Sequence, residues 1–178
     1  CVSEFLESME KVDFSKYYYD SKYEDQMEQV ATFTYQARVL RAFYLFELAR
    51  RYGDIPVPMK MLSIEEANSI EKTPFDQVVE FIVSECDECA AKLPETYIGM
   101  LDDEYGRVTK GFAMAVKSKT LLYAASRLHN PDGDVQKWKR AAQAALDIIN
   151  LGTYVLDSGD KVNTTASPEN VLVRMNSE

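Results

Sequence analysis

The sequence predicts a predominantly all-α fold of stacked helical hairpins, and two features support this prediction. Apolar residues recur with the 3.6-residue period of α-helices over most of the 178 residues, and little strand is expected before residues 154–156 and the C-terminal end. Capping signals and short turns divide the pattern into separate helices. A chain of this length has room for one domain with a substantial core.

The first two expected helices are joined by a polar and aromatic loop. Residues 2–12 look like the tail of an element that begins earlier, and residues 14–24 (FSKYYYDSKYE) form the loop. The second helix is expected over 25–51, where Gly53 provides its C-terminal stop. Residues 55–58 (IPVP) should be extended, because a residue that precedes proline avoids helical angles.

Three more helices are expected over 73–92, 109–128 and 134–152. Each begins at a residue whose side chain can cap a helix N-terminus, namely Thr73, Thr109 and Asp134. The segment 129–133 (HNPDG) is a turn by composition, so the last two helices should run antiparallel. Helices arranged in this way suggest a degenerate, tetratricopeptide-like layer.

Residues 41–58 (RAFYLFELARRYGDIPVP) are apolar without a clean polar face. A surface helix would show one apolar stripe and one polar stripe. We therefore expect the helical part of this run to pack between neighbouring helices on more than one side.

The charge balance excludes one class of function. The chain carries 29 acidic and 20 basic residues, for a net charge of −9. Nucleic-acid binding needs a basic face, so it is not expected. The sequence also has no apolar run of about 20 residues that would cross a bilayer.

The cysteines are three in number, and two of them form a C-x-x-C motif at Cys86 and Cys89. A metal site would need a second pair of ligands, and the one histidine, His129, stands alone in a loop. A redox pair would sit at a helix N-terminus, whereas this pair falls late in a helix. Both cysteines are expected to face the core.

Three segments in order resemble one family, the SusD/RagB-like outer-membrane nutrient-binding lipoproteins. Residues 37–48 with 52–56 (ARVLRAFYLFEL and YGDIP) are similar to that family's "EARFLRAFYYFxL…YGxVP" signature, with Gln36 at the usual position of the acid. Residues 106–124 (GRVTKGFAMAVKSKTLLYA) are similar to "GRATKGAAxALxARxLLY". Residues 138–156 are similar to "WxxAxxAAxxVIxxGxYxL".

The opening CVSEFLE also resembles an internal stretch of the family, so Cys1 is not expected to be the lipidated cysteine. The resemblance implies that residues 1–178 are a single partial SusD-like helical domain without the family's N-terminal and large C-terminal segments. It implies a cell-surface lipoprotein of the outer membrane in Bacteroidetes-type bacteria, attached to the membrane only through a lipid anchor outside this chain. It further implies that the protein binds glycans and passes them to a SusC-like TonB-dependent transporter, without catalysis or a cofactor.

The candidate ligand-binding residues are four tyrosines, Tyr17, Tyr18, Tyr19 and Tyr23. Sugar-binding sites stack the apolar face of a pyranose on an aromatic ring and satisfy the hydroxyls with polar neighbours. In another interpretation, every second tyrosine packs onto the helices, and these rings cover the entry to the second helix.

Other candidates have structural interpretations. Trp138 lies on an apolar helical face and is expected in the core. The acids at 102–104 (DDE) suggest calcium binding or a solvated loop, without EF-hand spacing. Charges within the second helix need partners, so ion pairs or carbonyl contacts are expected there, at Arg38, Arg41 and Glu47.

Two other functions are compatible with the same sequence. One is a helical-repeat scaffold that binds only protein partners, because a fold does not settle a function. The other is an all-helical glycoside hydrolase, which would need two facing carboxylates. No spacing of the acids singles out such a pair.

Overall fold

The computed structural model describes residues 2–97 and 106–154, and these residues fold into helices joined by loops. The elements are α1 (Val2–Met9), the 3-10 helix η1 (Ser15–Tyr17), α2 (Tyr23–Tyr52), α3 (Ile64–Ser69), α4 (Phe75–Ala90), α5 (Lys110–Ala125) and α6 (Val135–Asn150). Within the described ranges, extended pairing is limited to one antiparallel bridge between Ile55 and Thr73. The prediction of an all-α fold is confirmed, while the extended segments expected at 155–156 and near the C-terminal end lie outside the described residues.

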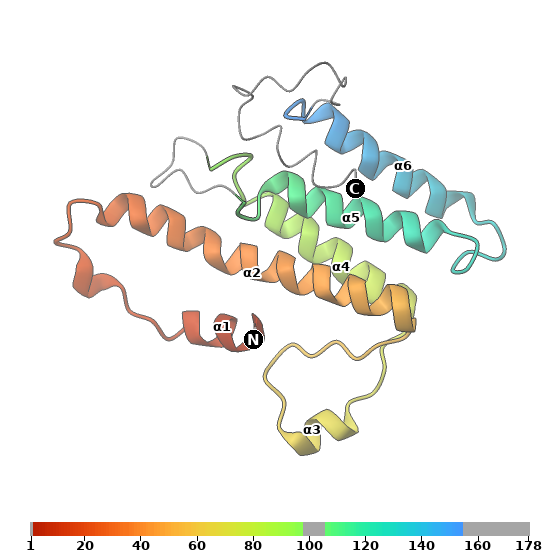
Figure 1. The fold of residues 1–178 in the computed structure, drawn as a ribbon, viewed down its shortest axis with the longest axis horizontal. Helices are drawn as coiled ribbons and strands as arrows, with labels where there is room; N and C mark the ends of the chain where they lie inside the picture. The colour runs from red at the N-terminus through yellow and green to blue at the C-terminus, as the bar shows by residue number, and fades with distance from the viewer. Residues whose placement is uncertain (1, 98–105, 155–178) are drawn as a thin grey trace.

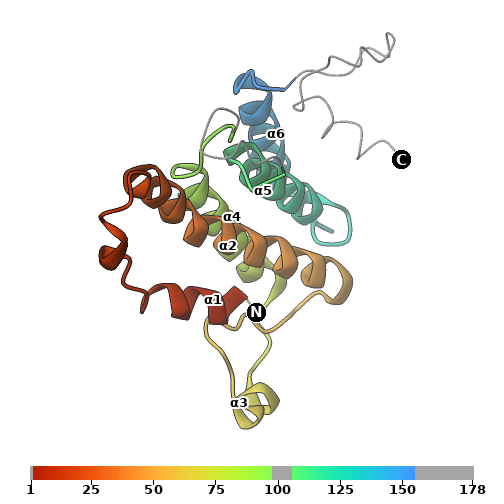
Figure 2. The same ribbon diagram turned by 60° about the vertical axis from the view of Figure 1, so that its left-hand side comes forward.

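Four of the helices form a layer in which α2 packs on α4, α4 on α5 and α5 on α6 (Figure 1). The turned view shows the same order, with α1 alongside α2 and α3 standing away from the layer (Figure 2). Helices α5 and α6 run in opposite directions, as the turn composition at 129–133 predicts (Figure 1). This order of neighbours matches the predicted stacked hairpins.

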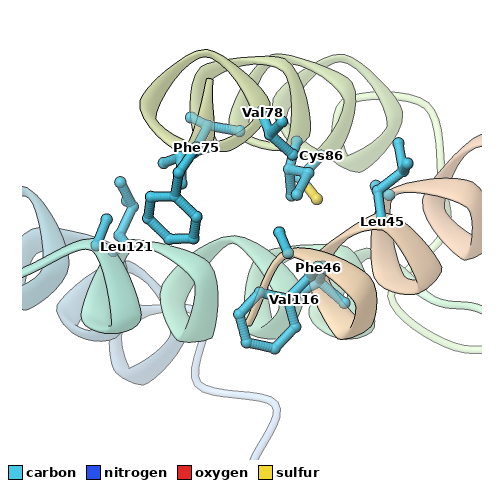
Figure 3. Close-up of a cluster of buried hydrophobic side chains, with 14 of the residues drawn as sticks. Leu45, Phe46, Phe75, Val78, Cys86, Val116 and Leu121 are labelled. Carbon is cyan, nitrogen blue, oxygen red and sulfur yellow. The ribbon is translucent and has the colours of Figure 1, made fainter. Parts of the chain in front are cut away.

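The main core lies where α2, α4 and α5 meet. Leu45 and Phe46 of α2 point toward Val78 and Cys86 of α4 and toward Val116 of α5 (Figure 3). Small residues complete the contact with α6, where Ala141 and Ala144 are buried. Burial of these side chains is the principal source of stability for such a layer.

Cys86 of the C-x-x-C motif belongs to this core, and Cys89 belongs to a second buried cluster with Val39, Leu93 and Ala113. Cys86 and Cys89 are fully buried and unpaired in a disulfide. Burial raises the pKa of the Cys86 thiol to about 12 and that of Cys89 to about 11. Thiols with such pKa values stay protonated at neutral pH, so the prediction of core-facing cysteines is confirmed.

The exit from α2 is built by three consecutive residues. Gly53 adopts a φ of 70°, which allows the chain to leave the helix while its N–H donates to the Ala49 carbonyl. The next residue, Asp54, accepts a 2.8 Å hydrogen bond from the N–H of Phe75, the first residue of α4. Ile55 then pairs with Thr73. The end of one helix therefore caps the start of another.

The predicted cap of α4 was wrong. Pro74 occupies the N-cap position and offers no side-chain hydrogen bond, so Thr73 does not cap the helix. Asp54 supplies the missing acceptor from 21 residues upstream. By contrast, the predicted caps Thr109 and Asp134 are confirmed, since their side chains accept hydrogen bonds from Phe112 and Gln136.

Replacing Asp54 with alanine should lower the free energy of unfolding by about 1–2 kcal/mol, the usual effect of removing an N-cap acceptor. Urea denaturation followed by circular dichroism measures this loss. Thr73→Ala is the matched control, because Thr73 keeps its backbone pairing with Ile55 and provides no cap. Equal losses in the two variants would contradict the capping role of Asp54.

Helix α2 packs against α1, α4 and α5, so the prediction that it lies between neighbouring helices on more than one side is confirmed. Tyr44, Leu48 and Tyr52 nevertheless remain exposed. The prediction that Trp138 lies in the core was wrong, because Trp138 is 48% exposed. Helix α6 has two adjacent apolar faces, and only the one that carries Ala141 packs on α5.

Helix α3 was not predicted, although its N-terminus carries a local signal. Ser63 and Glu66 form a capping box, in which the Ser63 hydroxyl accepts from the Glu66 N–H and the Glu66 carboxylate accepts from the Ser63 N–H. The spacing Ser-x-x-Glu is the known signature of this motif. The six-residue helix buries no side chain, which explains why apolar periodicity did not reveal it.

The three segments that carry the family resemblance contact one another. Phe46 of the first segment packs edge-on against Tyr123 of the second, with ring centroids 5.2 Å apart. A side chain at Gly111 of the second segment would collide with the Tyr154 ring of the third. The residue types at these positions therefore suit close packing between the three segments.

Candidate ligand-binding site

The four candidate tyrosines lie on the connection between α1 and α2. Tyr17 ends η1, and Tyr18 and Tyr19 follow it with ring centroids 3.6 Å apart and an interplanar angle of 38°. Exposed fractions are 61% for Tyr17, 56% for Tyr18 and 82% for Tyr19, whereas Tyr23 at the start of α2 is half-buried. The tyrosines at 17–19 therefore do not cover the entry to α2.

Two aspartates that accept hydrogen bonds from nearby backbone N–H groups shape this connection. The Asp13 carboxylate accepts from the Ser15 N–H at 2.9 Å, and the Asp20 carboxylate accepts from the Lys22 N–H at 2.8 Å. Aspartate stabilises turns in this way because its side chain reaches the backbone two residues on. The hydrogen bonds from Ser15 also lower the pKa of Asp13. The tyrosines are thus held between two aspartate-stabilised turns.

The Tyr18 and Tyr19 side chains also interact through polar atoms. A side-chain hydrogen bond with Tyr19 raises the pKa of Tyr18. A phenol hydroxyl can both donate and accept hydrogen bonds. Exposed polar residues surround the pair, including Lys16, Asp20 and Ser21. Aromatic faces beside polar groups are the chemistry that carbohydrate recognition uses.

The charged residues of α2 form structural ion pairs, as predicted. Glu85 of α4 lies between Arg38 at 2.6 Å and Arg41 at 2.8 Å. Glu47 pairs with Arg50 at 2.7 Å, within its own helix. Burial alone would raise the pKa of Glu85, but the hydrogen bonds from the two arginines outweigh it and lower the pKa. These charged side chains therefore form ion pairs with one another.

Two other candidates give no site in the described part of the chain. The acidic loop at 102–104 lies outside the described residues. The His129 ring stacks on the Phe75 ring, with centroids 3.6 Å apart and an interplanar angle of 8°, and burial lowers the pKa of His129.

Residues 2–97 and 106–154 contain no group of three potential metal ligands. No helix in the described ranges is long and apolar enough to span a membrane.

Sequence reasoning missed one hollow, which lies between α1 and α2. The groove has a volume of about 410 Å³ and is lined mainly by apolar side chains, namely Val2, Phe5, Phe33, Gln36, Ala37 and Leu40. The apolar positions of α1 and α2 could have indicated that the two helices meet. They could not indicate how completely the contact is filled.

Comparison with known proteins identifies the family of this chain. No protein-family model matches the chain. SusD-like protein P2 of Formosa agariphila is 31% identical over 127 residues, which are 71% of this chain and 22% of that protein. A SusD-like carbohydrate-binding protein of Bacteroides fragilis matches in structure with a TM-score of 0.60 and 30% identity, over 73% of this chain and 23% of that one. The chain belongs to the SusD-like family.

A more distant structure supports the same fold. Surface glycan-binding protein A of Bacteroides uniformis superposes with a TM-score of 0.61 and 20% identity, over 88% of this chain and 30% of that one. The SusD-like helical layer is thus present in full-length proteins considerably longer than this chain. The chain spans less than a third of the length of each of these three relatives.

Proposed function

We propose that the full-length protein is a cell-surface glycan-binding protein that delivers its ligand to a SusC-like TonB-dependent outer-membrane transporter. The observation that supports this most strongly is the exposed Tyr18–Tyr19 pair on a SusD-like helical scaffold. A membrane attachment through a lipid anchor outside this chain belongs to the same proposal.

The tyrosine platform, defined as Tyr17, Tyr18 and Tyr19, fits a sugar chain better than a compact ligand. The rings are exposed, and the connection that carries them lies at one end of the molecule (Figure 1). An exposed platform admits a long polysaccharide from either end, and stacking on the ring faces supplies affinity. The chain's net charge of −9 favours a neutral or basic glycan over a polyanionic one.

The carboxyl groups support binding over hydrolysis. A glycoside hydrolase needs a general acid whose pKa is raised, opposite a second carboxylate. Among the described residues, each carboxyl group with a shifted pKa is shifted downward, namely Asp13, Glu66, Glu80 and Glu85. These groups are held ionised by hydrogen bonds, which is unfavourable for a general acid.

The function is tested by titrating the full-length protein calorimetrically with a panel of neutral and charged polysaccharides. We expect saturable binding of at least one neutral glycan with no release of product, and co-purification with a TonB-dependent transporter. Release of oligosaccharides would contradict the binding function. Transporter association without binding of any glycan would favour the protein-only scaffold.

Replacing Tyr19 with alanine should weaken glycan binding about 2- to 13-fold, because one stacking contact of about 0.5–1.5 kcal/mol is lost. Tyr19→Phe keeps the ring and should bind within about twofold of the wild type. Since Tyr19 is 82% exposed, neither change should alter the denaturation midpoint. Unchanged affinity in Tyr19→Ala would remove Tyr19 from the site.

A further inference from the structure

The turn between α5 and α6 rests on the first residue of α4 through the one histidine of the chain. The His129 ring lies nearly parallel to the Phe75 ring, with centroids 3.6 Å apart and an interplanar angle of 8°. Phe75 is 9% exposed and belongs to the main core, where its side chain extends from α4 toward α5 (Figure 3). His129 therefore covers one face of a core side chain.

A second contact joins the same elements. The Lys137 amine of α6 donates to the His129 carbonyl at 3.0 Å and to the Asp76 carboxylate of α4 at 2.9 Å. Asp76 is exposed, and ion pairs at the surface contribute little to stability. The ring stack is therefore the stronger of the two contacts between the turn and α4.

The turn itself is closed by Asn130, independently of the histidine ring. The buried Asn130 side chain donates to the Asp134 carbonyl at 3.0 Å and accepts from the Asp134 N–H at 2.7 Å. The His129 N–H donates to the Ser126 carbonyl at 3.0 Å. Loss of the ring stack would thus undock the turn from α4 without unfolding it.

Protonation of His129 would place a positive charge in this contact. The charged side chains on the elements that meet here are Asp54 before α4, Asp76 of α4, Lys137 of α6, and Arg127, Asp132 and Asp134 of the turn. Burial disfavours the charged form most, Asp76 favours it and Lys137 disfavours it, and the net effect lowers the pKa of His129. A cation above the Phe75 face would be attracted to the ring, which opposes the effect of burial.

We propose that His129 makes the α5–α6 turn a pH-sensitive latch, in which the neutral imidazole holds the turn on α4 and the protonated imidazolium releases it in mildly acidic solution. Histidine is the side chain that ordinarily changes its charge between pH 5 and 8. Glycan binding is not involved, because the tyrosine platform lies on the connection between α1 and α2.

The direction of the pH effect is set by the lowered pKa of the docked histidine. An undocked histidine has its ordinary pKa of about 6.5, so the undocked turn binds more protons than the docked turn as the pH falls below that value. The stabilisation of the docked turn is therefore complete above about pH 6.5 and is lost as the pH falls through the docked pKa.

Hydrogen–deuterium exchange of the full-length protein at pH 7.5 and pH 5.5, followed by mass spectrometry, tests the latch. Each exchange rate is divided by the intrinsic rate at that pH, so that only the protection of the amides is compared. In the wild type, the protection of residues 126–137 should be at least about twofold lower at pH 5.5. Residues 78–86 in the middle of α4 should keep their protection.

Two variants separate the charge of His129 from its packing. His129→Phe keeps an aromatic ring on Phe75 without a titratable group, so its residues 126–137 should be equally protected at both pH values. His129→Gln removes the ring stack, so the same residues should show the lower protection at both pH values. Equal protection of the wild type at the two pH values would overturn the proposal, as would the wild-type pH dependence in His129→Phe.

An NMR titration of the wild-type protein with isotope-labelled histidine tests the proposal without any variant. The His129 ring resonances should titrate with a pKa below the ordinary value of about 6.5. A pKa at or above that value would show that the attraction of the imidazolium to Phe75 and Asp76 outweighs burial, and would overturn the latch.

Discussion

Replacing Glu85 with alanine is expected to lower the free energy of unfolding by about 3–5 kcal/mol, because removing one partner of a buried ion pair leaves uncompensated charge. The Glu85 side chain is 9% exposed and accepts from both Arg38 and Arg41. The Arg41 Nε atom already has no hydrogen-bond partner. Without Glu85, the 10%-exposed Arg41 side chain would lose its carboxylate partner, whereas Arg38 would keep its ion pair with Glu88.

The same ion pairs predict how stability depends on pH. The pKa of Glu85 is lowered in the folded protein, so its contribution is fully present above the unfolded pKa of about 4.3 and is lost as the pH falls through the folded value. Urea denaturation of the wild type between pH 6 and 3 should therefore show a steeper loss than Glu85→Gln. The exposed Glu65 provides the control, since Glu65→Gln should leave both the stability and its pH dependence unchanged. Parallel pH profiles for the wild type and Glu85→Gln would contradict this role.

Ile82→Ala should lower the free energy of unfolding by about 2–5 kcal/mol. Ile82 is fully buried in the core that joins α2, α4 and α5, so the lost methyl groups leave a cavity among side chains from three helices. The midpoint of urea denaturation measures the effect. Ile82→Val removes a single methylene and should cost about 0.5–1.5 kcal/mol. A loss below about 1 kcal/mol for Ile82→Ala would mean that the helices close around the cavity.

The sequence was sufficient where the deciding interactions are local. Thr109 and Asp134 were predicted as caps because each accepts a hydrogen bond from a residue two or three positions along the chain. Asp54 was not predicted as the cap of α4, since its partner is 21 residues away and the two meet only when the chain folds. A proline at the N-cap position was the local sign that another residue must supply the acceptor.

Apolar periodicity does not show which face of a helix packs against its neighbour. Trp138 and Ala141 both lie on apolar positions of α6, yet only Ala141 is buried. Which of two adjacent faces meets α5 depends on how the α5–α6 turn directs the helix. The tyrosine platform poses the same problem, because FSKYYYDSKYE is compatible with packed or exposed rings. The structure shows the rings at 17–19 exposed, between turns stabilised by Asp13 and Asp20.

The most direct test of the proposed function is a crystal structure of the full-length protein with an oligosaccharide derived from the glycan that it binds. The proposal predicts that a pyranose ring lies against the face of Tyr18 or Tyr19, with its hydroxyls hydrogen-bonded to neighbouring polar groups. A glycan bound elsewhere, with both tyrosine rings in contact with solvent alone, would contradict it.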